Sequence, residues 1–380
     1  MPNEDQLDSM RFPPESHAMN AEAAATNSGL AEVKRRHALR SFSELTQRRQ
    51  EASQSGYIVE GLLPARSIGI LVGDSGIGKS PWLYMFGLCV AAEVPFLGLP
   101  TTRGEVLILD YENSPGDSEE LVEHLRQHLG LDAVPESLTV WNANDCAPSF
   151  GQPTYTITDI ITEWASSAES PVKLVIIDPL AAFSPDAEEK NSAATRMLAT
   201  LRAMKRKYGL TFVLSHHRRK PPQDGHANLD DCQSPRGWFS DARGASALIN
   251  GTDVRLGLDL PGIAHGLKNG RSPEELALVL RGFGRVRGEI GPLYLARTYD
   301  EDSKPLGYRK LVGAQLLFGD EQQRALAQLE PRFTTGQAKA AYGRGDQATS
   351  DWLQKCARLG LIRRVGRGQW EKTPDSGEGR

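Results

Sequence analysis

The segment from Gly73 to Ser80 reads GDSGIGKS and fits the pattern GxxxxGK[ST]. Glycines let backbone N–H groups curl around phosphate oxygens, and the amino terminus of a following helix adds its positive dipole end. Such a loop places Lys79 on the β- and γ-phosphates and the Ser80 hydroxyl on Mg²⁺. An ordinary glycine turn is the alternative. We expect a site for ATP with Mg²⁺ that uses Gly73, Asp74, Ser75, Gly76, Ile77, Gly78, Lys79 and Ser80.

Proline at position 81 is unusual directly after such a loop. Proline is tolerated in the first turn of a helix because its missing N–H has no partner within the helix. In a phosphate loop this amide helps to hold the α-phosphate, and here it is absent. We expect a weaker grip on that phosphate and unchanged chemistry.

A carboxylate follows the next apolar run, Glu105–Asp110, which reads EVLILD and continues as Tyr-Glu-Asn. The carboxyl ends of parallel strands face the ligand crevice of a sheet. Glu112 is therefore expected to orient and deprotonate an attacking water. The alternative is a turn residue that caps the following helix, although Asn113, Ser114 and Asp117 are better caps.

A second buried run, Lys173–Asp178, also ends in a carboxylate. We expect Asp178 to hold Mg²⁺ through water, beside Ser80. The run after it ends in Ser215, His216 and His217, any of which could contact the γ-phosphate and report hydrolysis. A metal site at the two histidines has no neighbouring ligand in the sequence.

Two polar segments, 183–192 and 218–242, follow these strands, and long stretches of this kind are functional or mobile. Arg218-Arg219-Lys220 in the second segment is either a functional basic cluster or a solvated turn. The same segment holds Arg236-Gly-Trp-Phe. Trp238 could stack on unpaired bases or pack onto the domain.

The elements that must position these residues follow from periodicity. Short β-branched runs alternate with helix candidates at 80–93, 116–129, 157–168 and 191–208. Apolar runs without polar alternation are buried on both faces, which predicts a parallel sheet with flanking helices. Three more strand-like runs after Asn250 are expected to add antiparallel strands at the sheet edge.

Composition excludes several classes of protein. The 380 residues are 39% hydrophobic with a net charge of −4, so the chain can build a core and has no global basic field. The scattered cysteines form no CxxC pair and support neither a disulfide framework nor a zinc site. The acidic start resembles no signal peptide, and the apolar run 81–100 is interrupted by Glu93-Val-Pro, so we expect a cytoplasmic protein without a membrane span.

The motif order GDSGIGKS, ILDYEN, VIIDPL, LSHH and RGASAL resembles the RecA-like AAA-family ATPases of the RepA plasmid-helicase type, over about 58–298. The resemblance implies an α/β fold, a mostly parallel sheet flanked by helices, and rings with ATP at subunit interfaces. It also implies that Glu112 is catalytic and that His216 or His217 couples phosphate state to DNA-facing loops. Arg285-Val-Arg287-Gly resembles the Lys-x-Arg finger that one subunit donates to the next; a basic hairpin turn is the alternative.

The chain is expected to divide into a disordered or helical N-terminal extension (1–53), the ATPase domain (54–300), a linker (301–320), a winged helix-turn-helix (321–373) and a tail (374–380). In the C-terminal unit, helices at 336–342 and 348–359 precede a hairpin around Gly366-Arg-Gly. Residues 331–380 hold ten Lys or Arg and five Asp or Glu, a net of +5. This charge favours DNA, through Arg363, Arg364 and Arg367, over a protein partner.

These features together predict an ATP-hydrolysing motor that acts on DNA, with a hexameric helicase of a plasmid, phage or other mobile element as the expected form. Single-stranded DNA would lie in the ring channel and duplex DNA at the winged helix. The alternative is an ATP-gated DNA-binding regulator or recombination mediator that does not translocate. A small-molecule kinase is disfavoured by the strand inserted between the phosphate loop and Asp178.

Overall fold

The computed structural model describes residues 32, 56–144, 156–218, 227–242, 246–262, 277–285, 288–301, 304–317 and 320–373. The chain divides into two units, Met1–Gly56 and Tyr57–Arg380. The expected N-terminal extension, apart from Glu32, and the expected tail lie outside the described residues.

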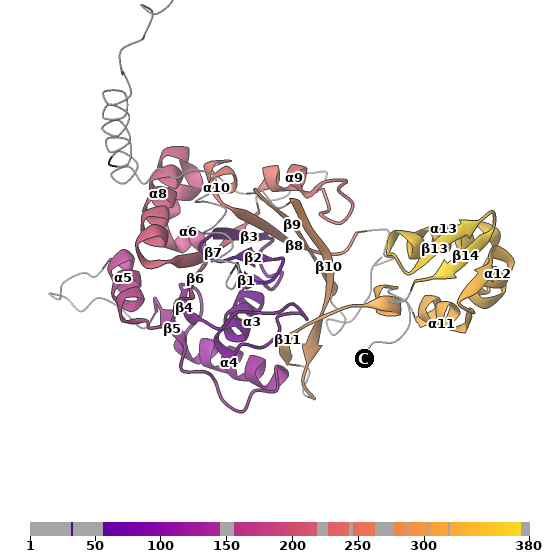
Figure 1. The fold of residues 1–380 in the computed structure, drawn as a ribbon, viewed down its shortest axis with the longest axis horizontal. Helices are drawn as coiled ribbons and strands as arrows, with labels where there is room; N and C mark the ends of the chain where they lie inside the picture. The colour runs from indigo at the N-terminus through magenta and orange to yellow at the C-terminus, as the bar shows by residue number, and fades with distance from the viewer. Residues whose placement is uncertain are drawn as a thin grey trace, which may run out of the picture. The chain divides into compact units, whose positions relative to one another are not determined.

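A nine-stranded sheet organises the described part of the ATPase domain, in the order β11-β10-β9-β8-β3-β7-β6-β4-β5. The strands from β8 to β5 all pair in parallel, and β9, β10 and β11 are antiparallel. This confirms the predicted RecA-like α/β fold (Figure 1). The bounds are β3 (Ile68–Gly73), β4 (Glu105–Asp110), β5 (Leu138–Asn142), β6 (Lys173–Asp178), β7 (Leu210–His217), β8 (Val254–Asp259), β9 (Ala277–Gly284), β10 (Gly288–Tyr299) and β11 (Pro305–Lys310).

Two strands differ from the sequence expectation. β8 was expected to be an antiparallel addition, but it pairs in parallel with β3. The long connection after β7 passes β3 and places β8 on its other side, and crossovers of that length produce parallel neighbours. β11 falls inside the range expected to be a linker and pairs with β10 instead. Its sequence, PLGYRK, is short and half polar, so its pattern did not stand out.

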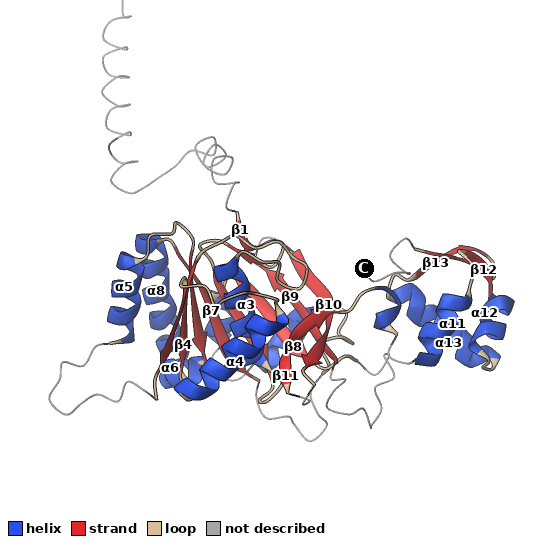
Figure 2. Cartoon of the chain, turned by 90° about the horizontal axis from the view of Figure 1, so that it is seen from below, coloured by secondary structure: helices blue, strands red, loops and turns tan. Residues whose placement is uncertain are grey.

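Helices cover both faces of the sheet. α3 (Lys79–Ala92) and α4 (Pro115–His128) pack in one core, whereas α5 (Ile157–Ser167) and α8 (Asn191–Tyr208) pack in the other. Figure 2 shows the two helix layers on either side of the strands. α3 is buried around most of its circumference, as expected for the apolar run after the phosphate loop. Within the described ranges, no helix is long and apolar enough to cross a membrane.

Short helices lie within or next to the described parts of the polar segments that followed β6 and β7 in the sequence. They are α6 (Leu180–Phe183), α7 (Pro185–Glu189), α9 (Pro235–Trp238), η3 (Phe239–Asp241) and α10 (Ser246–Gly251). Trp238 has 1% of its surface exposed. The structure therefore decides between the two roles considered for this residue: it packs onto the domain and is not available to stack on bases.

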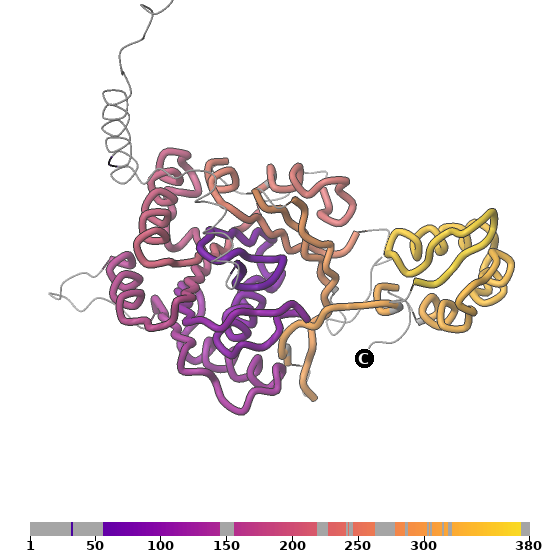
Figure 3. The backbone as a smooth tube through the Cα atoms, viewed as in Figure 1, coloured from indigo at the N-terminus to yellow at the C-terminus, as the bar shows by residue number. Residues whose placement is uncertain are grey.

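The antiparallel strands bring the far edge of the sheet back toward the helices on one face. Tyr308 of β11 and Leu295 of β10 are buried in the same core as α3. Figure 3 traces the chain from β10 through β11, which lies beside α4. A right-handed twist accumulates from strand to strand, so a wide sheet can curl over a helix in this way. A small β1–β2 hairpin (Tyr57–Val59 and Leu63–Pro64) precedes β3.

The C-terminal residues form a separate hydrophobic core. The elements are η6 (Gly313–Leu316), α11 (Asp320–Gln328), β12 (Arg332–Thr334), α12 (Thr335–Tyr342), α13 (Asp346–Arg358), β13 (Ile362–Gly366) and β14 (Gln369–Lys372). Phe333, Trp352 and Ile362 are buried together in this core. A capping box between Thr334 and Gln337 begins α12. The two helices and the hairpin expected here are confirmed.

Candidate active site

A cavity of about 340 Å³ lies at the carboxyl ends of the parallel strands, where the loop after β3 meets α3. Most of the sequence-predicted site residues gather around it. Its lining residues include Ser75, Gly76, Gly78, Lys79, Ser80, Pro81, Glu112, Asn113, Asp178 and His217. Arg297, Leu306, Gly307 and Tyr308 complete the wall from the antiparallel strands.

The loop itself has the conformation that its glycines permit. Gly76 and Gly78 have φ values of 75° and 105°, in a region that side-chain-bearing residues rarely adopt. Gly73 is extended, but a Cβ there would press against the carbonyl of Leu258. Ile77 is buried and anchors the loop in the core of α3. The loop therefore leads directly into the amino terminus of α3, where the positive end of the helix dipole meets the cavity.

Lys79 is buried and its amine lies inside the loop. Its Nζ donates to the carbonyl oxygens of Gly73 at 3.0 Å and Asp74 at 2.8 Å. It also lies 3.1 Å from Nδ1 of His217. Because an ammonium group can only donate, Nδ1 of His217 is the acceptor and the ring carries its proton on Nε2. Burial lowers the pKa of Lys79, and the carboxylates of Asp178, Glu112 and Asp74 oppose this shift.

Ser80 and Asp178 provide the oxygen atoms that Mg²⁺ prefers. Asp178 ends β6, has 3% of its surface exposed and faces the same cavity as Ser80. Burial raises the pKa of Asp178, and a hydrogen bond from the Ser80 hydroxyl opposes the rise. A buried carboxylate beside a hydroxyl fits a divalent cation, because the cation would offset the cost of burying the charge.

Glu112 is exposed and lines the cavity from the turn after β4. The turn is fixed by Asp110, which is fully buried at the end of β4. Oδ1 of Asp110 accepts from the backbone N–H groups of Glu112 at 3.0 Å and Asn113 at 2.9 Å. Its Oδ2 accepts from the Asn113 side chain at 2.7 Å and from the hydroxyl of Tyr84 in α3. The capping role falls to Ser114, whose hydroxyl accepts from the N–H of Asp117, so Glu112 is not needed as a cap.

The two histidines at the end of β7 are on opposite sides of the strand. His217 faces the cavity, whereas His216 is fully buried and pairs with Glu188 of α7 at 3.2 Å. Ser215, the third candidate for contacting the γ-phosphate, is fully buried. Among the described residues, no group of three or more His, Cys, Asp or Glu side chains could hold a metal ion.

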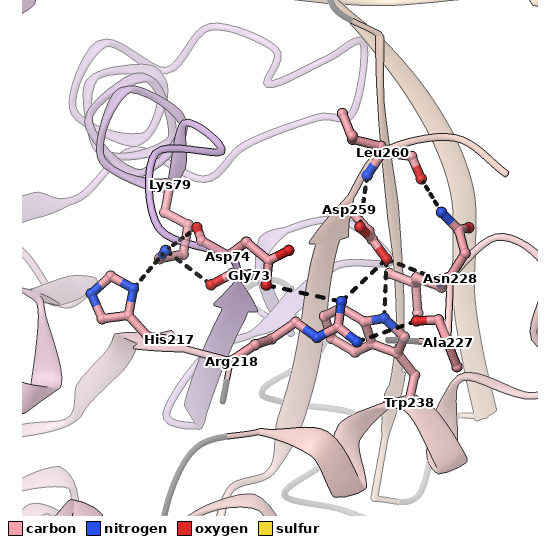
Figure 4. Close-up of polar contacts among 11 residues, drawn as sticks. Gly73, Asp74, Lys79, His217, Arg218, Ala227, Asn228, Trp238, Asp259 and Leu260 are labelled. Carbon is pink, nitrogen blue, oxygen red and sulfur yellow. Dashed lines mark hydrogen bonds and ion pairs between the residues drawn. The ribbon is translucent and has the colours of Figure 1, made fainter. Parts of the chain in front are cut away.

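Arg218 continues β7 beyond His217 and links the loop to β8 (Figure 4). Its backbone N–H donates to the carbonyl of Gly73, and its guanidinium lies 4.0 Å from Asp74 and 3.6 Å from Asp259. The same guanidinium stacks 4.3 Å from the ring centre of Trp238. Burial raises the pKa of Asp259, opposed by backbone hydrogen bonds and by the charge of Arg218. Arg218 is thus a buried structural cation, whereas Arg219 and Lys220 lie outside the described residues.

Arg285 lies at the turn after β9, beside the amino-terminal end of β8. The phosphate loop lies at the opposite, carboxyl end of the parallel strands. The backbone N–H of Arg285 donates to the carbonyl of Asp253, which directly precedes β8. Its guanidinium donates to the carbonyl oxygens of Asn250 and Thr252 at the end of α10. Since β8 and β3 run in parallel, this end is remote from the loop of the same chain. Arg287 lies outside the described residues.

Three residues in or directly behind the cavity wall, Asp110, Arg297 and Tyr308, were given no role from the sequence. Asp110 carried a detectable signal, since it is a carboxylate at a strand end. Arg297 and Tyr308 carried none, because each contacts the phosphate loop across more than two hundred residues of chain. No spacing rule within one sequence connects such positions.

The fold and the cavity define a P-loop NTPase of the RecA-like class. A family model described as an AAA domain matches residues 34–223, which is half of the chain, and the chain belongs to this family. Among solved structures, a KaiC-like protein from the hyperthermophilic archaeon Pyrococcus horikoshii is similar, with a TM-score of 0.41 and 13% sequence identity. That match covers 68% of this chain and 97% of the other. No curated protein matches the chain in sequence.

Proposed function

We propose that this protein hydrolyses ATP and uses the energy to act on DNA, as a ring-forming motor of the helicase type. The observation that carries the proposal is one cavity in which Lys79, Ser80, Asp178, Glu112 and His217 converge. Each of these side chains stands at the carboxyl end of a parallel strand or in the adjoining turn or helix start. This is the place where ligands bind in sheets of this kind.

The proposed chemistry assigns one task to each group. Lys79 leaves the loop carbonyls and neutralises the β- and γ-phosphates of ATP. Glu112 takes the proton of the attacking water. The turn that Asp110 fixes holds Glu112 at the cavity. Mg²⁺, when held by Ser80 and Asp178, would supply positive charge that offsets the charge of the phosphates.

His217 is the proposed reporter of hydrolysis. Its Nδ1 lies 3.1 Å from the Lys79 amine, so it loses this donor when the amine moves to phosphate. The next residue, Arg218, is tied to Trp238 and Asp259. A movement of the Lys79 amine can therefore alter the position of the segment that contains α9, which follows β7 in the chain. His216 is the weaker candidate because its partner is Glu188.

The DNA-binding part of the proposal rests on the C-terminal unit. Its order of helix, strand, two helices and a hairpin fits a winged helix-turn-helix, in which α13 would enter the groove. Of the three wing arginines, Arg363 shares Glu371 with Arg332, so part of its charge is neutralised. Arg364 and Arg367 are exposed and remain the proposed phosphate contacts.

A hexameric ring would place the active site between subunits. Arg285 lies at the amino-terminal ends of the parallel strands, away from the phosphate loop of its own chain, so it can assist catalysis only in a neighbouring subunit. We propose it, with Arg287, as the donated finger on this basis.

The test is steady-state ATP hydrolysis with and without single-stranded DNA, with Lys79→Ala as the blank. The proposal predicts hydrolysis that DNA stimulates and that the variant lacks, and strand displacement on a forked duplex. Hydrolysis indifferent to DNA, from a protein that elutes as a monomer in gel filtration, would contradict the motor. ATP-dependent DNA binding with negligible turnover would favour the ATP-gated regulator.

A further inference from the structure

Two side chains from the far edge of the sheet hold the phosphate loop from outside. Arg297 of β10 and Tyr308 of β11 are register partners across the antiparallel pair, so they project from the same face. The guanidinium of Arg297 donates to the carbonyl oxygen of Ile77 at 2.8 Å. The hydroxyl of Tyr308 donates to the carbonyl oxygen of Gly78 at 2.9 Å. Consecutive carbonyls of the loop are thus held by one cross-strand pair.

These carbonyl contacts fix where the loop amides point. In a planar trans peptide the C=O and the N–H project in opposite directions. The peptide whose carbonyl belongs to Ile77 carries the N–H of Gly78, and the next one carries the N–H of Lys79. Arg297 and Tyr308 hold these carbonyls from outside the loop, and the carbonyl of Gly78 also accepts from the N–H of Trp82 in α3. Both N–H groups therefore point away from the pair, which is the direction of the concave side of the loop. These are the donors that a diphosphate group needs.

The pair can do this because it is itself rigid. Tyr308 has 2% of its surface exposed and packs in the core of α3. His128 of α4 bridges the two strands, with Nε2 at 3.0 Å from the carbonyl of Tyr308 and Nδ1 at 3.0 Å from the Thr298 hydroxyl. A Cβ at Gly78 would collide with both Arg297 and Tyr308, so only glycine allows the pair to approach.

Arg297 has a second feature that Tyr308 lacks. Its guanidinium carries five N–H donors, which include one to the carbonyl of Ile77 and one to the hydroxyl of Tyr308. The side chain lines the same cavity as Pro81, the position at which the loop helix has no amide to offer. A permanent positive charge therefore faces the same cavity as the position that lacks the donor.

We infer that Arg297 and Tyr308 form an internal clamp that presents the loop amides to the diphosphate of a nucleotide, and that Arg297 supplies positive charge where Pro81 supplies no N–H. The ligand class is any molecule with a diphosphate group, and the base is not read by the clamp. The inference rests on the proposed nucleotide binding. Tyr308 is then a positioning residue, since it acts only through the loop, whereas Arg297 both positions the loop and faces the ligand.

The test measures dissociation constants for inorganic pyrophosphate, ADP and ATP by calorimetry, with wild type, Tyr308→Phe, Arg297→Ala and Arg297→Lys. One neutral hydrogen bond gives an expected loss of about five- to tenfold for Tyr308→Phe, by the same factor for all three ligands. Arg297→Ala should cost about tenfold or more for each ligand, because it removes a charged donor. Arg297→Lys should recover part of this loss by restoring the charge without the fork.

Tyr294→Phe is the matched control. Its hydroxyl donates to Asp230 at 2.7 Å from the same strand, β10, and lies outside the cavity lining. It should leave all three affinities unchanged. Thermal midpoints of the ligand-free variants separate a loss of folding from a loss of binding.

Two results would overturn the clamp. One is unchanged pyrophosphate affinity in both Tyr308→Phe and Arg297→Ala. The other is a loss for ATP and ADP without one for pyrophosphate, which would show that the pair contacts the base or ribose. Wild-type protein that binds none of the three ligands would overturn the proposed function and the clamp with it. Tight wild-type binding with unaffected variants would overturn the clamp alone.

Discussion

The buried carboxylate of Asp110 gives the sharpest prediction for stability. Asp110→Asn keeps the shape of the side chain but replaces one acceptor oxygen with an NH₂ group. In the wild type the side-chain NH₂ of Asn113 donates to Oδ2 of Asp110 at 2.7 Å. If the remaining oxygen of the variant stays with the two backbone N–H groups, the new NH₂ group faces this NH₂ of Asn113. That hydrogen bond is lost, and the hydroxyl of Tyr84 must turn its proton away.

The cost can be estimated from these contacts. A hydrogen bond to a charged group contributes about 1.5–3 kcal/mol, and a buried donor without a partner costs about 1–3 kcal/mol. Loss of one such bond and weakening of the others should lower the free energy of unfolding by about 3 kcal/mol. For a domain of this size that corresponds to a fall of roughly 6–12 °C in thermal midpoint. The turn that carries Glu112 should loosen as well, which lowers kcat more than it changes KM.

The assay is thermal unfolding followed by circular dichroism, together with steady-state ATP hydrolysis. Asp117→Asn is the control, because its carboxylate also accepts hydrogen bonds next to the same helix, but from the exposed Ser114. The control should shift the midpoint far less. A midpoint for Asp110→Asn equal to that of wild type would refute the role of Asp110 as the support of the turn.

Other perturbations test separate parts of the structure. Glu112→Gln should bind ATP with wild-type affinity and hydrolyse it at least a hundredfold more slowly by the scale of general-base catalysis, and equal turnover would remove Glu112 from the chemistry. His217→Gln should retain hydrolysis but lose its stimulation by DNA. If the stimulation survives, His217 is not the residue that reports hydrolysis. Burial lowers the pKa of His128 below 6.5, so its neutral ring contributes stability that is present at pH 7 and lost as the pH falls below 6.5. The thermal midpoint of wild type should therefore fall more steeply between about pH 7 and pH 5 than that of His128→Gln, and parallel curves would contradict this. Trp238→Ala should lower the free energy of unfolding by about 3–5 kcal/mol, measured by urea titration, whereas an exposed tryptophan would cost almost nothing.

The order of elements was predictable because its signals are local. Apolar runs identify β3, β4, β6 and β7, and the glycine pattern before Lys79 identifies the loop. Strand-end carboxylates at Glu112 and Asp178 could be assigned to one cavity because the carboxyl ends of parallel strands meet at one edge. The predicted direction of β8 was wrong because the direction of a strand depends on which strand the preceding connection places it beside, and no local pattern shows that.

The wall of the cavity made by Arg297 and Tyr308 could not be predicted. Pairing of β10 with β11 depends on cross-strand partners, and the contacts of both residues with the loop depend on the curl of the sheet. The choice between His216 and His217 was left open for a related reason. Alternation along β7 shows that they face opposite sides, but only the position of α7 shows which side holds Glu188.

The distance along the chain between the phosphate loop and its clamp has a consequence for how the protein is made. Ile77 and Gly78 leave the ribosome 220 and 230 residues before Arg297 and Tyr308. Contacts between such remote positions form late, because closing a long loop must precede any gain from the contact. A nascent chain that ends before β10 therefore has the loop sequence without the bonds that orient its amides. Nucleotide would therefore stabilise the domain more strongly once the last strands have joined the sheet, and completed copies would gain more protection from unfolding than partial ones.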